Sequence, residues 1–438
     1  MGQQTKPNII IFFTDQQRWD TVGCYGTHND ITPNLDKAAQ NGVRFQNAFS
    51  CQPVCTPARA CIQTGRFGTE TGVFRNRRPL APDENTIAKI MRNEGYEAGY
   101  IGKWHLAITR DKPVPLKLRG GYEEFWLASD GLEHTTHPYE GLLFDSQNKK
   151  ITFKDKYRAD AITDFAIDYL RTRTLEKPFF LFLSYLEPHH QNDMEKFVSP
   201  DGYAEKFKDY PVPGDLIDQE GDWRDGLADY YGMCKRLDEN FGRINDEIEA
   251  LGLKDNTIII YTSDHGCHFK TRNSEYKRSC HESSIRIPLI ISGPGFESGE
   301  VREELASLID IAPTVIDIGG ASIPEYMHGK SLKALVDGEV YSWPENVFIQ
   351  ISETGVARAI RTGRWKYCVH APDKDGWKDS GSKVYLEEFL YDLESDPHEK
   401  VNLIGNQDYM DICNGLAEAL KIKMAEAGEE IPVILRNC

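Results

Sequence analysis

The stretch from Cys55 to Arg66 carries residue types that could transfer or hydrolyse an anionic group. Cys55 is followed by Pro57 and Arg59, and the residues after them favour a helix. Proline suits the first turn of a helix, because its missing N–H would have no partner there in any case. Cys55 would then lie at the positive end of the helix, where an anion or a transferring oxyanion is favoured. A structural buried thiol is the alternative interpretation, and this spacing alone leaves both open.

Polar residues also follow four apolar segments, residues 8–13, 98–101, 178–186 and 257–261. Continuous apolar runs of this kind are typical of strands buried on both faces of a mostly parallel sheet. Such sheets bind ligands at the carboxyl ends of their strands. Each polar group alone is a weak indication. We expect the following residues to share a pocket with Cys55 and Arg59: Asp15, Gln16, Lys103, His105, His189, Asp264, His265 and Lys277.

This set of side chains indicates a metal site flanked by positively charged lysine side chains. Carboxylate and amide oxygens suit Ca²⁺ or Mg²⁺, and an imidazole nitrogen extends the choice to Mn²⁺. A cation held there, flanked by lysines, would hold and polarise a tetrahedral oxyanion ester. The sequence therefore predicts hydrolysis of an anionic ester.

The order of the expected elements predicts an α/β fold. Strands alternate with helices as far as about residue 320, which predicts a large doubly wound, mostly parallel sheet flanked by helices. Short strands and a final helix then predict a small C-terminal antiparallel sheet plus helix. We place the catalytic α/β domain at residues 1–340 and the α+β subdomain at 341–438. Residues 285–292 are expected to form a strand, and residues 191–222 a long surface insertion.

Composition limits the partners that this chain can have. The 438 residues have a formal net charge of −17, which argues against non-specific nucleic-acid binding. Arg75, Arg77 and Arg78 form a local basic cluster that could meet an anionic substrate or simply be solvated. No apolar run approaches the roughly 20 residues of a membrane span. Ten cysteines without framework spacing favour reduced thiols in the cytoplasm, although a protein that has lost an export signal would look the same.

Several motifs resemble type I sulfatases, the formylglycine-dependent sulfatases of the alkaline-phosphatase superfamily. The run from Cys55 through Pro57 and Arg59 to Thr64-Gly65-Arg66 is similar to the family signature. Further similar segments are Lys277 with His281-Glu282, residues 309–314, 363–367 and 391–403. The resemblance covers nearly the whole chain and implies a sulfuric ester hydrolase of alkaline-phosphatase-like fold.

The resemblance also implies roles for single residues. Cys55 would be oxidised to formylglycine by a maturation enzyme, and the hydrate of that aldehyde would be the nucleophile. Arg59 would hold the modified side chain, and Asp264 would help to activate its hydroxyl. One divalent cation, Ca²⁺ by preference and Mg²⁺ or Mn²⁺ otherwise, would be bound by Asp15, Gln16, Asp264, His265 and the modified Cys55.

The same resemblance divides the remaining work between lysines and histidines. Lys103 and Lys277 would bind the sulfate oxygens. His189, with Lys277, would protonate the leaving alcohol, and His105 would take the proton from the second hydroxyl as sulfate leaves. An alkoxide is a poor leaving group unless a general acid neutralises it. Cys51 also precedes a proline by two residues, but Cys55 stands where its arginine should be, so we expect a structural thiol.

Two departures from the family pattern leave alternatives open. The pairs Asp15-Gln16 and Asp264-His265 resemble the choline-sulfatase and phosphonate-monoester-hydrolase branch. His281 stands where tyrosine is usual, and either lines the substrate pocket or packs. We expect a hydrolase of sulfated carbohydrates, such as glycosaminoglycans or host glycans. A phosphonate or phosphodiester hydrolase, a choline-sulfatase-like enzyme and a degenerate sugar-binding protein are the alternatives. The oligomeric state is left open.

Overall fold

The computed structural model describes residues 6–26, 30–173, 176–340 and 342–436. Within these residues the larger sheet has 11 strands in the order β11-β2-β10-β9-β1-β8-β3-β4-β6-β5, with β7 paired to β6. Its centre is parallel, because β1 pairs in parallel with β8 and β9, and β3 with β8 and β4. The predicted α/β class with a large, mostly parallel central sheet is therefore confirmed, although both flanks of the sheet are mixed.

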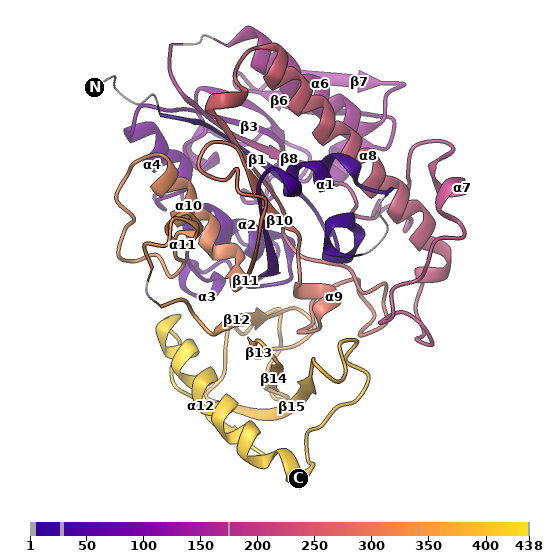
Figure 1. Ribbon diagram of the computed structural model, residues 1–438, viewed down its shortest axis with the longest axis vertical. Coiled ribbons are helices and arrows are strands. Elements are labelled where there is room, and N and C mark those ends of the chain that lie inside the picture. Colours follow the sequence, from indigo (N-terminus) through magenta and orange to yellow (C-terminus); the bar gives the residue numbers. More distant parts are fainter. Residues whose placement is uncertain (1–5, 27–29, 174–175, 341, 437–438) are drawn as a thin grey trace.

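The central strand β1 (Asn8–Thr14) has a continuous apolar run from Ile9 to Phe13 between two polar residues. All seven of its residues are buried. Alternate side chains point to opposite faces of a strand. Ile9, Ile11 and Phe13 therefore pack in the core that includes Ala58 of α2. Ile10 and Phe12 pack in the second core, which includes Phe241 of α8. The sheet is thus covered by helices on both faces (Figure 1).

The helices of the larger part form these two layers. One core contains residues of α2 (Cys55–Thr64), α4 (Ile87–Asn93) and α10 (Ile311–Ile318). The other contains residues of α1 (Pro33–Gln40), α6 (Arg158–Thr172) and α8 (Trp223–Ala250). The short helices are α3 (Gly68–Thr71), α5 (Leu132–Thr135), α7 (Tyr203–Phe207), α9 (Glu282–Ile285) and α11 (Leu332–Val336).

The other strands of the larger sheet lie between residues 43 and 307. Those nearest the centre are β8 (Phe179–Ser184), β9 (Thr257–Ser263), β3 (Glu97–Lys103) and β4 (Phe125–Ser129). The flanking strands are β2 (Val43–Phe49), β5 (Thr136–His137), β6 (Glu140–Asp145), β7 (Lys150–Lys154), β10 (Leu289–Ser292) and β11 (Glu300–Ser307).

A smaller sheet follows, at the lower end of Figure 1. Strands β12 to β15 are antiparallel, and β16 pairs in parallel with β15. Helix α12 (Met410–Glu426) packs against this sheet, with Leu420 and Met424 fully buried. The strands are β12 (Asn346–Ile351), β13 (Ala357–Thr362), β14 (Trp365–His370), β15 (Val384–Asp392) and β16 (Val433–Leu435). A predicted domain boundary at residue 340 stays a prediction, although the strands of the two sheets do fall on either side of it.

Two sequence expectations need correction. Residues 285–292 were expected to form one strand, but α9 ends at Ile285 and β10 begins only at Leu289. The intervening segment carries Arg286, whose guanidinium lies over the Trp19 ring at 3.9 Å. The insertion at 191–222 does not lie wholly on the surface, because Phe207 and Leu216 are buried in a third apolar cluster. Apolar residues without helical or strand spacing can still anchor a loop.

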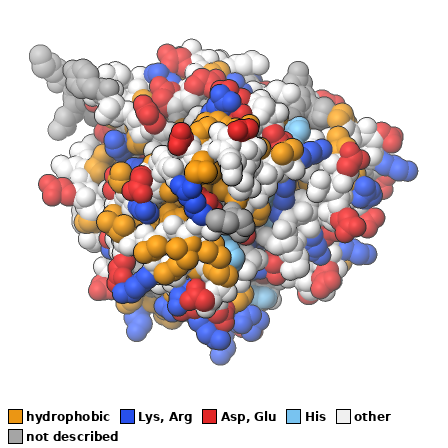
Figure 2. Space-filling model, turned by 90° about the horizontal axis from the view of Figure 1, so that it is seen from below, with side chains coloured by type: hydrophobic (Ala, Val, Ile, Leu, Met, Phe, Trp, Pro, Cys, Tyr) orange, Lys and Arg blue, Asp and Glu red, His pale blue; other side chains and the backbone are white. Residues whose placement is uncertain are grey.

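The surface agrees with the mixed composition of the chain. Seen from below, acidic and basic side chains are interspersed around hydrophobic ones (Figure 2). None of the helices in the described part of the chain combines the length and apolarity that crossing a membrane requires.

Candidate active site

Helix α2 places Cys55 in its first turn, at the carboxyl end of the sheet. All ten residues of this helix are buried. The side-chain Oδ1 of Asn76 accepts the Thr56 N–H at 3.1 Å, which satisfies one of the free donors of the first turn. The helix ends at Gly65, whose φ of 65° is left-handed and suits a residue without a Cβ. The sequence TGR therefore has a structural role as a helix stop.

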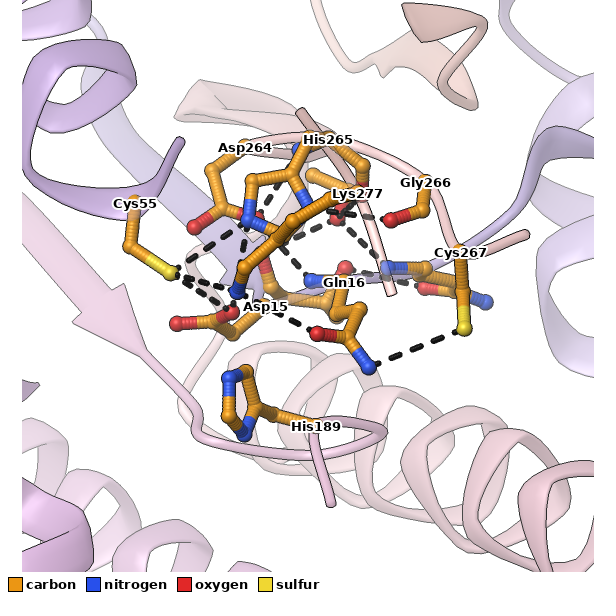
Figure 3. A network of polar contacts seen from close by, with 12 residues as sticks. Asp15, Gln16, Cys55, His189, Asp264, His265, Gly266, Cys267 and Lys277 are labelled. Carbon is orange, nitrogen blue, oxygen red and sulfur yellow. Dashed lines mark hydrogen bonds and ion pairs between the residues drawn. The ribbon is translucent and has the colours of Figure 1, made fainter. Parts of the chain in front are cut away.

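The Cys55 thiol lies among positively charged and imidazole side chains (Figure 3). Its Sγ is 3.0 Å from Lys277 Nζ, 3.3 Å from His265 Nε2 and 3.5 Å from Asp15 Oδ1. Burial alone would raise the pKa of Cys55, but Lys277, Lys103 and His265 outweigh it and hold that pKa well below its usual range.

Asp15, Cys55, Asp264 and His265 form a set that fits a metal ion. One ligand atom from each lies within 4.8 Å of all the others. The buried Oδ2 of Asp264 has no hydrogen-bond partner, as an atom reserved for a cation would. His265 directs Nδ1 at the Gly266 carbonyl at 2.9 Å, which leaves Nε2 free to bind a metal.

The two carboxylates of this set differ in pKa. Burial and then the neighbouring charge of Asp15 raise the pKa of Asp264 to about 6. Burial and Cys55 would also raise the pKa of Asp15, but Lys103, His189 and Arg59 hold it below its usual range. Two buried carboxylates this close favour a cation between them.

Gln16 contacts both Asp264 and Lys277, and its role as a metal ligand stays a prediction. Its backbone has a φ of 70°, and its N–H donates to Asp264 at 2.9 Å. Its side-chain Oε1 accepts from Lys277 Nζ at 3.2 Å. Gln16 thus contacts two residues of the predicted site, and its amide oxygen lies beside the lysine.

Arg59 and Lys103 brace the ends of neighbouring strands. The Arg59 guanidinium donates to Asp15 at 3.0 Å and to the Lys103 carbonyl at 2.9 Å. Lys103 Nζ lies 2.9 Å from Asp15 and 3.3 Å from Glu133. The glycine at position 102 of β3 permits this arrangement, because a Cβ there would lie 1.8 Å from the Ser184 carbonyl oxygen. The Arg59 guanidinium thus holds Asp15 and the strand ends, and its expected contact with the modified Cys55 side chain stays a prediction.

Both predicted catalytic histidines approach the thiol. The Cys55 side chain acts to raise the pKa of His189, and the His105 side chain acts to lower the pKa of Cys55. His189 directs Nδ1 at the His190 carbonyl at 2.6 Å, which leaves Nε2 for proton transfer. Burial first, and then Lys277, lower the pKa of His189. His105 has a φ of 60°, a left-handed conformation that is uncommon outside glycine and concentrates at functional sites.

The weaker candidates for substrate binding lie in two different environments. His281 Nε2 lies 3.1 Å from the Tyr391 hydroxyl, and its ring contacts Phe389. His281 therefore packs between the start of α9 and the smaller sheet, which favours a packing role over a place in the substrate pocket. Arg75, Arg77 and Arg78 lie on the loop that carries Asn76, next to the start of α2.

Sequence reasoning missed three residues around the site. Glu133 pairs with Lys103 from the short helix α5, and Asn76 binds the first turn of α2. Glu353, from the smaller part of the chain, accepts the N–H of Asn76 at 2.6 Å. A local pattern marks none of them. The basic cluster of Arg75, Arg77 and Arg78 singles out the loop of Asn76, but not the Asn76 side chain.

Comparison with known proteins agrees with this geometry. The sulfatase family model matches residues 7–321, and a C-terminal model described as N-sulphoglucosamine sulphohydrolase matches residues 274–426. The chain therefore belongs to the sulfatase family, which confirms the resemblance seen in its motifs. It is an enzyme of the sulfuric ester hydrolase class within the alkaline-phosphatase superfamily.

Individual relatives span nearly all of the chain. An ulvan-active sulfatase of Formosa agariphila is 31% identical over 98% of this chain and 83% of its own length. An N-acetylglucosamine-6-O-sulfatase of Bacteroides thetaiotaomicron is 27% identical over 93% and 84%. A solved structure described as a complex with its substrate D-glucosamine-2-N,6-O-disulfate superposes with a TM-score of 0.79 at 26% identity, covering 97% of this chain and 98% of that one.

Proposed function

We propose that this enzyme removes sulfate from a sulfated carbohydrate, using a formylglycine formed from Cys55 and one divalent cation, preferably Ca²⁺. The observation that carries the proposal is the position of Cys55 Sγ, within 3.5 Å of Lys277, His265 and Asp15. A thiol in that position would lie beside Lys277 and beside three residues that could hold a hard cation. An oxygen nucleophile beside a cation suits the same surroundings better.

The substrate class rests on the relatives together with the chemistry of the site. An ulvan-active sulfatase and an N-acetylglucosamine-6-O-sulfatase align with nearly the whole chain. These names describe substrates of the relatives, and the shared feature is a sulfated sugar. A sulfated monosaccharide or oligosaccharide is therefore the partner that we propose, with a formylglycine-generating enzyme as the maturation partner.

The residues of the chain can divide the reaction between them. When bound, the cation would supply a Lewis acid and the formylglycine hydrate an attacking hydroxyl. Lys277 and Lys103 would hold the sulfate oxygens, and Asp264 would help to activate the attacking hydroxyl. His189 would donate a proton from Nε2 to the departing sugar oxygen.

His105 would complete the cycle by accepting the proton of the second hydroxyl, which allows sulfate to leave. General acid and base catalysis of this type contributes roughly 10²–10⁴-fold each. Asp15 and His265 would hold the cation, His265 through Nε2.

The deciding experiment measures the mass of the peptide that contains Cys55 after expression with a maturing enzyme. Conversion to the aldehyde replaces H₂S by O, and the peptide becomes lighter by that difference. Cys55→Ala should abolish sulfate release while the protein stays folded. Cys51→Ala is the matched control and should keep most of the activity. A persistent free thiol in an active enzyme would refute the formylglycine proposal.

A second function is favoured by one specific observation. The pairs Asp15-Gln16 and Asp264-His265 meet at the predicted metal site, and the sequence resembles phosphonate monoester hydrolases at these pairs. Matured enzyme should be assayed with an aryl sulfate and an aryl phosphonate at equal concentration. Much faster turnover of the phosphonate would replace the sulfatase proposal by this alternative.

We also propose that the enzyme works in the cytoplasm with reduced thiols. In support, the nine cysteines of the described residues are all free thiols. Fractionation of the source cells with an antibody against the enzyme tests this location, and recovery outside the cytoplasm would contradict it.

A further inference from the structure

Arg75 and Arg77 carry positive charge without an acidic partner. Among the described residues, neither forms an ion pair with a carboxylate, although the chain has 68 acidic residues for 51 lysines and arginines. Arg77 is exposed, and Arg75 is partly buried with a buried Nε that has no hydrogen-bond partner. In so acidic a protein, unpaired guanidinium groups side by side indicate a site for an external anion.

The position of this pair is fixed beside the nucleophile. Asn76 stands between the two arginines and binds the N–H of Thr56 at 3.1 Å, one residue after Cys55. Arg75 Nη1 also donates to the Asn76 carbonyl at 2.8 Å, which orients its guanidinium. The loop therefore borders the start of α2.

Trp377 joins the two arginines from the C-terminal part of the chain. The guanidinium carbons of Arg75 and Arg77 each lie 5.8 Å from the Trp377 ring centroid. The ring is 38% exposed. The Gly376 carbonyl accepts the Glu353 N–H at 3.1 Å, and a Cβ at Gly376 would lie 2.6 Å from that nitrogen. The tryptophan thus stands on a closely packed turn.

Arg78 has a different environment. Its guanidinium carbon lies 4.3 Å from the Phe74 ring centroid, and its Nε is buried. We assign Arg78 to packing of the loop.

We propose that Arg75, Arg77 and Trp377 form a second subsite, which binds an acidic substituent of the substrate in addition to the sulfate that is cleaved. The substituent is a sulfate or a carboxylate, because both offer the planar or forked oxygens that guanidinium groups bind. The exposed Trp377 ring gives the apolar face of a sugar ring a surface to pack on. This inference rests on the proposed function and narrows it to saccharides with at least two negative charges.

The test measures binding separately from turnover. The probes are glucosamine 6-sulfate, glucosamine 2-N,6-O-disulfate, and unsaturated chondroitin disaccharides with a carboxylate and one sulfate. Their dissociation constants for the full-length Cys55→Ser protein are measured by calorimetry at 50 mM and 200 mM salt. The second and third probes distinguish a second sulfate from a neighbouring carboxylate. Sulfate release by the matured enzyme is followed in parallel by ion chromatography.

We expect at least one doubly charged probe to bind at least tenfold more tightly than the monosulfated sugar. Arg75→Ala with Arg77→Ala should remove that advantage. It should also reduce the salt dependence of binding, because the positive charges whose attraction salt screens are lost. Trp377→Ala should weaken binding of all three sugars by a similar factor. Arg364→Ala is the matched control, because Arg364 also stacks on a tryptophan, at 4.8 Å from Trp365.

Two results would overturn the subsite. One is equal affinity for singly and doubly charged probes, or no binding of any doubly charged probe. The other is an unchanged preference in the double arginine variant whose melting temperature matches that of the Arg364→Ala control. The proposed function fails separately, if matured enzyme releases no sulfate from any sugar while its binding preference remains.

Discussion

The Glu353 carboxylate accepts the backbone N–H of Asn76 at 2.6 Å, across 277 residues of sequence. Its other oxygen pairs with Arg278 at 2.7 Å. Arg278 follows Lys277 directly, and Asn76 binds the first turn of the helix that carries Cys55. One carboxylate from the smaller part of the chain therefore holds the two segments that carry Cys55 and Lys277.

The Glu353 side chain contacts Asn76 and Arg278 and not Cys55 itself, yet replacing it should slow catalysis. Loss of a helix cap costs about 1 kcal/mol, and a tenfold change in rate corresponds to about 1.4 kcal/mol. We expect Glu353→Ala to lower kcat about tenfold. Glu353→Gln keeps an acceptor for Asn76 and should recover part of that loss. Both are measured per mole of aldehyde, so that incomplete maturation is not counted.

The exposed Asp373, close by in sequence, provides the control. Asp373→Ala should leave kcat unchanged. If Glu353→Ala has the same kcat as this control, Glu353 does not position the site.

Replacing Lys277 and replacing Lys103 should lower catalytic efficiency to a similar extent but lower the stability of the fold to different extents. Lys277→Met removes a charge beside Cys55 and Gln16, and we expect kcat/KM to fall roughly 10²–10³-fold, as for other oxyanion donors. Lys103→Met should cause a similar loss and also leave buried Asp15 and Glu133 without their shared cation. Removing one partner of a buried pair costs about 3–5 kcal/mol. Denaturant unfolding should therefore show a much larger loss for Lys103→Met. Equal stability of the two variants would contradict this account.

Calcium should stabilise the folded enzyme through Asp264. Asp15 and Asp264 are both fully buried, and a cation between them removes their repulsion. A ligand present at 100 times its dissociation constant stabilises by about 2.7 kcal/mol. The melting temperature should rise when Ca²⁺ is added after chelation, and Asp264→Asn should lose most of that rise. Asp373→Asn serves as the control. The same Ca²⁺ response in Asp264→Asn would place the ion elsewhere.

Asp310 should make stability depend on pH between about 4 and 7. Burial raises its pKa to about 7, although its carboxylate accepts the N–H groups of Ser307 and Lys330. Because the folded pKa lies above the unfolded one, this contribution to stability is complete below the unfolded pKa. It is lost as pH rises through about 7. The free energy of unfolding should thus fall less between pH 5 and 7.5 in Asp310→Asn than in the unchanged enzyme. A parallel decline in both would show that Asp310 is ionised at both pH values.

The sequence predicted those elements whose signal is local. Strand β1 has five consecutive apolar residues from Ile9 to Phe13, and α2 has an early proline and is followed by Gly65. Strand β11 was missed, because Glu300–Ser307 contains three glutamates and lies at the edge of the sheet. Strand β2 was missed as well, since its buried and half-buried residues do not alternate regularly.

The predicted site could be assembled only in part from the sequence. Strand ends identified Asp15, Lys103, Asp264 and His265, because parallel strands bring their carboxyl ends together. Glu133 and Glu353 lie on short turns far from their partners in sequence. Their contacts depend on how the loops pack, which no periodic pattern encodes. The sequence did not indicate Trp377 either, because its contacts with Arg75 and Arg77 also depend on how the loops pack.

The Asn76 loop has a consequence for how enzymes of this architecture diversify. Asn76 binds the first turn of α2, whereas the arginines on either side of it lie over Trp377. In the described part of the chain, these arginines form no hydrogen bond or ion pair with Cys55 or the predicted metal ligands. Natural variation at positions 75, 77 and 377 can therefore exchange one sugar for another while the reaction itself is inherited unchanged. Asn76 and Glu353 cannot vary so freely, and a graft of this loop between relatives should succeed only when both are carried with it.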